Sequence, residues 1–319
     1  MSMRRSLQAS AATLCLSALV AGCGQSVDGS STIDTKNVSA ASPESPGPRV
    51  LHEKWPEKVP SRGLAKGLAL PLEAFMTSYA DEIAVQEARD VAETACMRRY
   101  GFTDWRTEDL GVAPPVSDNA SNMPRRYGLS ILAEAKEYGY HVPSTGTEST
   151  PPPEQEAAGA ATVLQGVDGS QKVMSFKGSA LPEGGCTGEV NRKVGTLDSH
   201  VVEELSSESF LQSQQEPAVK TAMAAWSGCM KDRGYDAPTV WDTDELVGVQ
   251  SQTPTDKEIA IAVADVECKQ ETDLIKIWFD QESAIQRQLI KKNQASLSGA
   301  QQKADKTLDV ASGVTASLR

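Results

Sequence analysis

The cysteines are the residues of this sequence whose types and spacing predict covalent chemistry. The 319-residue chain contains six cysteines, and four of them lie in the main part of the sequence, separated by 90, 43 and 39 positions: Cys96, Cys186, Cys229 and Cys268. A structural zinc site would need cysteines in closely spaced pairs, which these are not. Outside the cytoplasm, an even number of cysteines predicts disulfides, and four cysteines allow three pairings.

The N-terminus has the three parts of a secretory signal. Arg4 and Arg5 supply positive charge, a short apolar stretch follows, and the small residues Ala21 and Gly22 precede Cys23. The apolar stretch is shorter than the roughly 20 residues that span a bilayer. The sequence therefore predicts export, with the general secretory and twin-arginine routes both open.

The four residues Val20 to Cys23 resemble the lipobox of bacterial prolipoproteins. The resemblance implies that residues 1–22 are a cleaved signal peptide and that the thiol of Cys23 receives a diacylglyceryl group. An ordinary secretory signal that contains a cysteine is the alternative. Residues 23–65 are expected to form a flexible tether, because the Ser, Thr, Asp, Pro and Gly that follow Cys23 bury little apolar surface.

Two acyl chains would hold such a protein stably at a bilayer. We therefore expect an extracytoplasmic protein, lipid-anchored at the cell membrane, with the membrane itself as a partner through the lipid on Cys23. Removal of residues 1–22, which hold two arginines and no acid, changes the formal charge from −12 to −14. A chain this acidic is a poor ligand for nucleic acid, although Arg98-Arg99 and Arg125-Arg126 could form local basic patches.

Other residues that could do chemistry do not form a known catalytic pattern. The histidines His52, His141 and His200 have no neighbours at metal-ligand spacing, and there is no P-loop, dinucleotide fingerprint or G-x-S-x-G segment. Acidic residues such as Asp242 and Asp244 could bind calcium or act as acid and base, but solvated surface is the expected use in a chain with 43 acids. We predict no catalytic, cofactor-binding or metal-ligating residue.

Two segments around the cysteines repeat one helix ending. Cys96 to Phe102 and Cys229 to Tyr235 both read C-M-basic-x-x-G-aromatic, after alanine-rich sequence. A glycine after the last helical residue adopts the left-handed conformation, and the next aromatic folds back onto the last turn. Tyr138-Gly139-Tyr140 predicts a third ending of this kind, for a helix that starts near Leu129.

Each repeated ending places a cysteine one turn before a helix end, and one more cysteine follows in each half of the sequence. Cys186 lies in a glycine-rich turn that opens a short helix, and Cys268 lies within a long helix. Joining each cysteine to the next one gives two similar units. This argument favours the pairs Cys96–Cys186 and Cys229–Cys268.

The remaining pattern predicts a mainly α fold: a disulfide-braced helical body of two similar helix-Cys units over residues 66–253, with long loops and little β. Phe75, Tyr79, Ile83 and Val91 form one apolar stripe. A second helix begins at Pro217, and its apolar face holds Val219, Met223, Trp226 and Met230. The stretch from Glu154 to Phe176 predicts either a helix that ends at Gly166 or a hairpin that turns at Asp168-Gly169.

Residues 254–319 predict a long C-terminal helix and a frayed tail. Thr255 and Glu258 have capping-box spacing, and the helical pattern runs to about Leu308. A helix of about 50 residues would measure roughly 75 Å. It is therefore expected either to project beyond the body or to break, around Ser296 to Gly299.

Together these motifs resemble a group of secreted lipoproteins of actinomycete bacteria. The lipobox, the C-M-x-x-x-G-aromatic endings, Pro182 to Glu189 and Glu258 to Cys268 carry the resemblance, which covers most of the chain after about residue 70. It implies a fold and no activity. We expect an interaction or scaffolding protein whose partner is an envelope protein or wall component. The alternatives are a cell-wall hydrolase with paired carboxylates, and a small-ligand-binding lipoprotein whose pocket Trp226, Trp241 or Trp278 would line.

Overall fold

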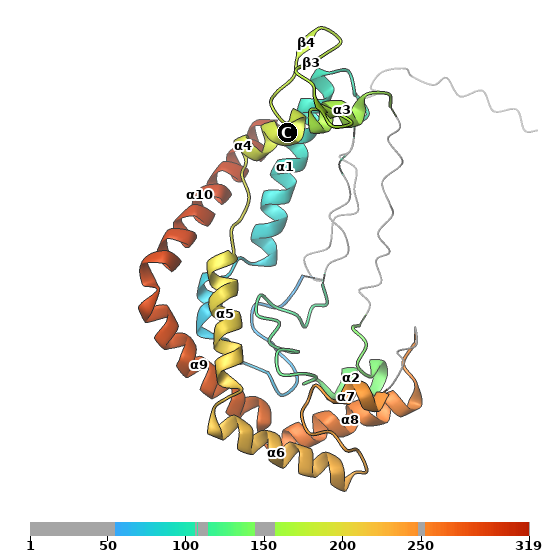
Figure 1. Ribbon diagram of the computed structural model, residues 1–319, viewed down its shortest axis with the longest axis vertical. Helices are drawn as coiled ribbons and strands as arrows, with labels where there is room; N and C mark the ends of the chain where they lie inside the picture. Colours follow the sequence, from blue (N-terminus) through green and yellow to red (C-terminus); the bar gives the residue numbers. More distant parts are fainter. Residues whose placement is uncertain (1–54, 106, 108–113, 144–156, 248–252, 319) are drawn as a thin grey trace, which may run out of the picture. The chain divides into compact units, whose positions relative to one another are not determined.

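The computed structural model describes residues 55–105, 107, 114–143, 157–247 and 253–318 (Figure 1). This part of the chain is mainly helical with two small hairpins, which confirms the expected fold class. The helices are α1 (Tyr79–Arg99), α2 (Leu132–Tyr138), α3 (Ala160–Gln165), α4 (Gly185–Lys193), α5 (His200–Ser213), α6 (Pro217–Asp232), α7 (Thr243–Val247), α8 (Asp256–Glu271), α9 (Leu274–Lys292) and α10 (Gln294–Leu318), and the 3-10 helix η2 (Pro71–Phe75) precedes them. The antiparallel hairpins pair β1 (Val167–Asp168) with β2 (Gln171–Lys172) and β3 (Ser175–Phe176) with β4 (Ser179–Ala180).

The helices α1 and α10, the first and last α-helices of the described residues, lie side by side (Figure 1). The buried face of α1 is built from Val85, Ala88 and Ala92, against Ala311 and Val314 of α10. Small side chains on both helices allow close approach of the two backbones. The predicted stripe through Ile83 and Val91 is therefore not the buried face of α1.

Asp90 lies half-buried on α1, and burial raises its pKa to about 6, with the hydrogen bond from Gln86 lowering it and the charge of Glu93 raising it. The folded chain therefore holds this proton more tightly than the unfolded chain, so stability is lost as the pH rises from about 4 through about 6. We expect Asp90→Asn to stabilise the protein at pH 7 by on the order of 1 kcal/mol, after discounting for exposure. Urea unfolding of both proteins between pH 4 and pH 8 checks this, and equal stability at pH 7 would contradict it.

The largest apolar cluster joins α6, α8 and α9. Trp226 of α6 and Trp278 of α9 are both fully buried in it. On α6 the buried residues Val219, Trp226 and Met230 share the face that the sequence pattern predicted, and Pro217 occupies the first turn as expected. The face of α8 that packs against this cluster includes Ile261 and Ala264.

The C-terminal segment is helical to Leu318, in three pieces. The breaks fall at Thr272-Asp273 and at Asn293, not around Ser296 to Gly299 as expected. Asp273 has a φ of 54°, and short polar side chains tolerate such non-helical backbone better than most residues. The expectation of a frayed tail is also wrong, because Ala311 and Val314 are buried. The long C-terminal helix is α10.

Two loop regions also differ from the expectation. Residues 55–65, assigned to the tether by composition, lie on the folded body, where Ala65 is fully buried and the Leu64 N–H donates to the Ser130 carbonyl at 2.9 Å. The two alternatives for the stretch around Gly166 are both present in succession, since α3 ends at this glycine and β1 and β2 then form a hairpin.

Candidate functional site

The structure joins Cys96 to Cys186 and Cys229 to Cys268, with 5.7 Å between the Cα atoms of each pair. These are the pairs that the repeated helix endings favoured. Three of the four cysteines are fully buried, and Cys229 is partly exposed. Cys23, the expected lipidation residue, lies outside the described residues.

Both repeated helix endings have the predicted glycine geometry. Gly101 has a φ of 93° and Gly234 a φ of 89°. After each glycine the aromatic residue donates its N–H to the methionine carbonyl, from Phe102 to Met97 at 3.2 Å and from Tyr235 to Met230 at 2.9 Å. This six-to-one bond closes the last turn of the helix. The endings are therefore caps that fix the position of the cysteine one turn earlier.

The two units share a further feature that sequence reasoning missed. The second cysteine of each pair begins a C-x-x-E segment, which ends at Glu189 in the first unit and at Glu271 in the second. Each of these glutamates forms an ion pair with an arginine near the end of the capped helix, Arg99 or Arg233. The repeated C-x-x-E was visible in the sequence and would have strengthened the predicted pairing.

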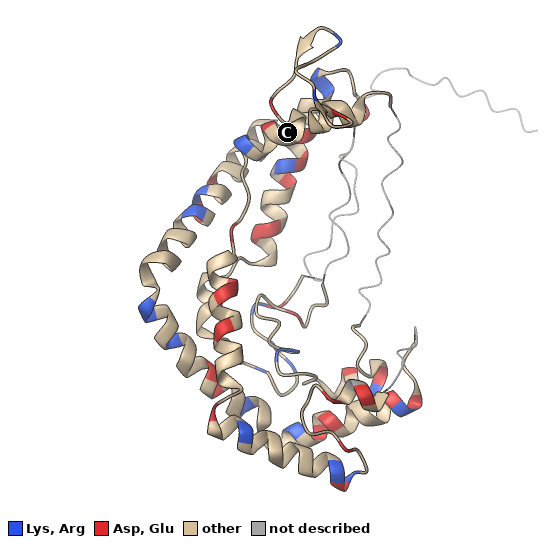
Figure 2. Ribbon diagram, viewed as in Figure 1, with Lys and Arg blue, Asp and Glu red and all other residues tan. Residues whose placement is uncertain are grey.

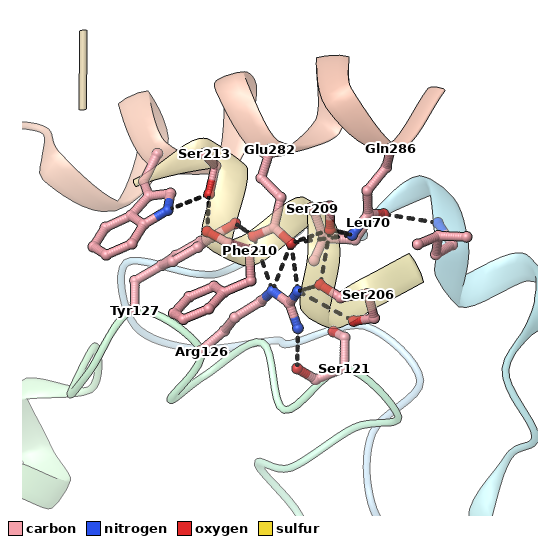
Figure 3. Close-up of polar contacts among 12 residues, drawn as sticks. Leu70, Ser121, Arg126, Tyr127, Ser206, Ser209, Phe210, Ser213, Glu282 and Gln286 are labelled. Atoms are coloured by element: carbon pink, nitrogen blue, oxygen red, sulfur yellow. Dashed lines mark hydrogen bonds and ion pairs between the residues drawn. The ribbon is translucent and has the colours of Figure 1, made fainter. Parts of the chain in front are cut away.

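The most elaborate polar site is a buried network centred on Glu282 of α9, which is fully buried (Figure 3). Its carboxylate accepts hydrogen bonds from the Arg126 guanidinium, with Nε at 2.9 Å and 3.1 Å from the two oxygens. The Tyr127 hydroxyl donates to it at 2.7 Å and the Ser209 hydroxyl at 2.8 Å. The Gln286 amide donates at 3.1 Å. Both oxygens of this carboxylate are therefore occupied by structural donors.

The partners of Glu282 are themselves held by other elements. The Arg126 guanidinium also donates to the Ser206 carbonyl of α5 at 3.1 Å and to the Ser121 carbonyl at 3.4 Å. Gln286 accepts a hydrogen bond from the Leu72 N–H of η2 at 2.9 Å. The network thus fastens η2 and the loop that contains Arg126 to α5 and α9. Its geometry is that of an internal brace.

The electrostatics of the network follow from its burial. Burial lowers the pKa of Arg126, but the hydrogen bonds and charge of Glu282 outweigh this effect and raise it overall. Burial and the neighbouring Glu282 raise the pKa of Tyr127 well above its usual value. The arginine therefore stays charged and the tyrosine stays neutral near pH 7.

A second buried network joins α8 to the loop before α2. Lys269 donates to Asp265 at 2.9 Å and to the Leu129 carbonyl at 3.1 Å, and both charged side chains are almost fully buried. The Trp226 indole donates to Asp265 at 3.0 Å. Burial raises the pKa of Asp265 and lowers that of Lys269, and each charge opposes the shift of the other. This network again connects helices and a loop.

The basic pair Arg125-Arg126 is not a surface patch. The Arg126 side chain is 11% exposed and is occupied by Glu282. The Arg125 side chain donates to the carbonyls of Tyr140 and His141 at 3.0 Å and 2.8 Å, at the end of α2. In the other pair, Arg99 is ion-paired with Glu189, as described above. Arg99, Arg125 and Arg126 therefore hold parts of the fold together.

The other residues singled out in the sequence are dispersed. His141 Nε2 lies 3.5 Å from Glu258 Oε2 without the alignment of a hydrogen bond, and His200 is exposed at the start of α5. His52 lies outside the described residues. Asp242 accepts two hydrogen bonds from Thr239. Among the residues that the structure describes, no group of three His, Cys, Asp or Glu is arranged to hold a metal ion.

The tryptophans considered for a ligand pocket divide into two kinds. Trp226 and Trp278 are 0% exposed, so neither can touch a ligand that enters from solvent. Trp241 is 46% exposed and meets the rings of Phe210 and Trp278 edge-on. Two of the three tryptophans are therefore core residues.

No described helix is long and apolar enough to cross a bilayer. No protein-family model matches the chain, and no significant match was found to a curated protein or to a solved structure.

Proposed function

We propose that this chain is an extracytoplasmic lipoprotein, anchored to the cell membrane by lipid on Cys23, whose helical body serves interaction or scaffolding in the cell envelope. The proposal joins a sequence motif to a structural observation. The motif is the small-residue segment before Cys23, after a charged and apolar N-terminus.

The observation that carries the proposal is the pair of disulfides. Disulfides form and persist in oxidising compartments and are rare in the reducing cytosol. Both cysteines of the Cys96–Cys186 bridge are fully buried, and the second bridge joins the fully buried Cys268 to the partly exposed Cys229, so both bridges serve as structural braces. This use of cysteine supports a protein that matures outside the cytoplasm.

An interaction or scaffolding role is supported by how the described polar groups are used. The two buried networks commit their charges to neighbouring helices and loops, centred on Glu282 and on Asp265. Among the remaining charged residues, acidic ones lie along α5 and around α8 (Figure 2), and α10 carries two lysines and two aspartates. Such surfaces suit contacts with other macromolecules.

Lipid on Cys23 is the decisive test. Mass spectrometry of the protein recovered from cell membranes should show a chain that starts at Cys23 and carries a diacylglyceryl group. The variant Cys23→Ser should lose the lipid and leave the membrane fraction, because a lipid-free chain lacks the acyl anchor. An unmodified Cys23, or a chain that retains Met1 in the soluble fraction, would refute the proposal.

The partner would be identified by cross-linking in intact envelopes. Cells that make the anchored protein should yield a specific cross-linked species, and cells that make Cys23→Ser at the same level should not. Cross-links that are equally strong in both would show that the contact does not depend on membrane anchoring.

A further inference from the structure

The described chain begins with a turn-rich segment, residues 55–70. Its turns are closed by main-chain bonds, from the Gly67 N–H to the Pro60 carbonyl at 2.8 Å and from the Lys66 N–H to the Gly63 carbonyl at 3.2 Å. Gly63 has a φ of 69°, and a Cβ there would lie 2.6 Å from the Ser130 carbonyl oxygen. The segment is thus held tightly to the loop that contains Ser130.

This segment exposes three basic side chains. Lys58, Arg62 and Lys66 recur every fourth residue, and all three are exposed. The two ammonium groups form no ion pair or hydrogen bond with the described residues, and Arg62 Nη2 lies only within 3.9 Å of Glu134. Glu57, the one acid in the segment, accepts the N–H and hydroxyl of Ser61.

The charge of this region is opposite in sign to that of the protein. Residues 55–70 hold three basic side chains and one acidic side chain, a net charge of +2, in a chain whose formal charge is −12. Elsewhere in the described part several basic side chains are neutralised by carboxylates, as with Arg126, Lys269 and Arg233. Lys58 and Lys66, by contrast, keep their charges open to solvent where the folded body begins.

We propose that residues 55–70 dock the folded body on anionic lipid headgroups of the bilayer that holds the Cys23 lipid. The inference rests on the proposed function. Only 31 residues separate Cys23 from Trp55. A lipid on Cys23 would therefore raise the effective concentration of this segment at the membrane surface. Each Lys or Arg near an anionic membrane surface favours the docked state over the undocked state by about fivefold. Val59, 40% exposed between Lys58 and Pro60, adds apolar surface at the same place.

Lysine acylation on tethered protein tests the docking. The mature chain made without lipidation has one thiol outside the disulfides, on Cys23, which can be coupled to a maleimide lipid in phosphatidylcholine vesicles with or without phosphatidylglycerol. Acylation of each lysine is then followed by mass spectrometry. We expect Lys58 and Lys66 to react at least about fivefold more slowly on the anionic vesicles. The exposed lysines Lys220 and Lys303, on α6 and α10, should react equally on both.

A matched pair of variants tests the electrostatic origin. Arg62→Gln should reduce the protection of Lys58 and Lys66 about fivefold, whereas Arg287→Gln, which removes the same charge from an exposed position on α9, should leave it unchanged. Salt near 1 M should abolish the protection, since the screening length is then about 3 Å.

Two outcomes would overturn the docking proposal. One is equal acylation of Lys58 and Lys66 on neutral and anionic vesicles. The other is equal protection of Lys220 and Lys303, which would show attraction without a preferred face. Neither depends on lipidation in the cell, because the vesicle tether is chemical. An unmodified Cys23 in cells would instead refute the proposed function and leave the vesicle measurement unchanged.

Discussion

Replacing Glu282 with alanine should lower the free energy of unfolding by about 3 to 5 kcal/mol. Glu282 is fully buried and accepts hydrogen bonds from Arg126, Tyr127, Ser209 and Gln286. Its removal leaves the Arg126 charge inside the protein without a counter-ion and several donors without an acceptor, and both losses cost more than the ion pair itself contributes. Urea unfolding at constant m-value measures the change.

The same helix offers a matched control. Asp280 forms an ion pair with Lys276, but the two side chains are 51% and 50% exposed. Asp280→Ala should therefore cost less than about 1 kcal/mol. The double variant Arg126→Met/Glu282→Met should be more stable than Glu282→Ala, because no uncompensated charge remains. A loss below about 1 kcal/mol for Glu282→Ala would mean that water reaches this site.

Removing the Cys96–Cys186 bridge with a double alanine variant should cost about 4 to 5 kcal/mol. The bridge closes a loop of 90 positions, and the loop-entropy model assigns such a loop about 4.6 kcal/mol. The Cys229–Cys268 bridge closes 39 positions, for which the same model gives about 3.9 kcal/mol. Denaturant unfolding without reductant should rank the two variants in this order.

Connectivity is checked separately by peptide mapping without reduction. A peptide that joins Cys96 to Cys229 would contradict both the structure and the two-unit interpretation. If removal of the Cys229–Cys268 bridge costs more than removal of the Cys96–Cys186 bridge, native-state strain and not loop length dominates the contribution of the bridges to stability.

Much of the fold could be predicted because its local signals are strong. The C-M-basic-x-x-G-aromatic endings specify both a cap and the place of a cysteine, and Gly101 and Gly234 have the left-handed backbone that this argument requires. The disulfide pairing followed from the repeat alone. The boundaries between α8, α9 and α10 were harder to predict, because the helix breaks at Asp273 and Asn293 contain neither glycine nor proline.

The buried networks were missed because their partners are far apart in the sequence. Arg126 and Glu282 are separated by 156 positions, and the Arg125-Arg126 pair looked like a surface patch. One local signal was available. Glu282 and Gln286 continue the apolar stripe of Ile275, Trp278 and Leu289 on α9, and a charged residue on such a face predicts a buried partner. The identity of that partner depends on tertiary structure.

Because α1 packs against α10, this part of the core can form only after the C-terminal residues have been synthesised. Ala92 and Val314 belong to one cluster, although 222 positions separate them, so this part of the core is complete only when nearly the whole chain is available. Contacts of such long range form late and slow the folding rate. In a nascent chain this cluster would therefore stay incomplete until the last residues emerge. Truncation by two helical turns at the C-terminus would remove Val314 from the cluster that also contains Val85 and Ala88.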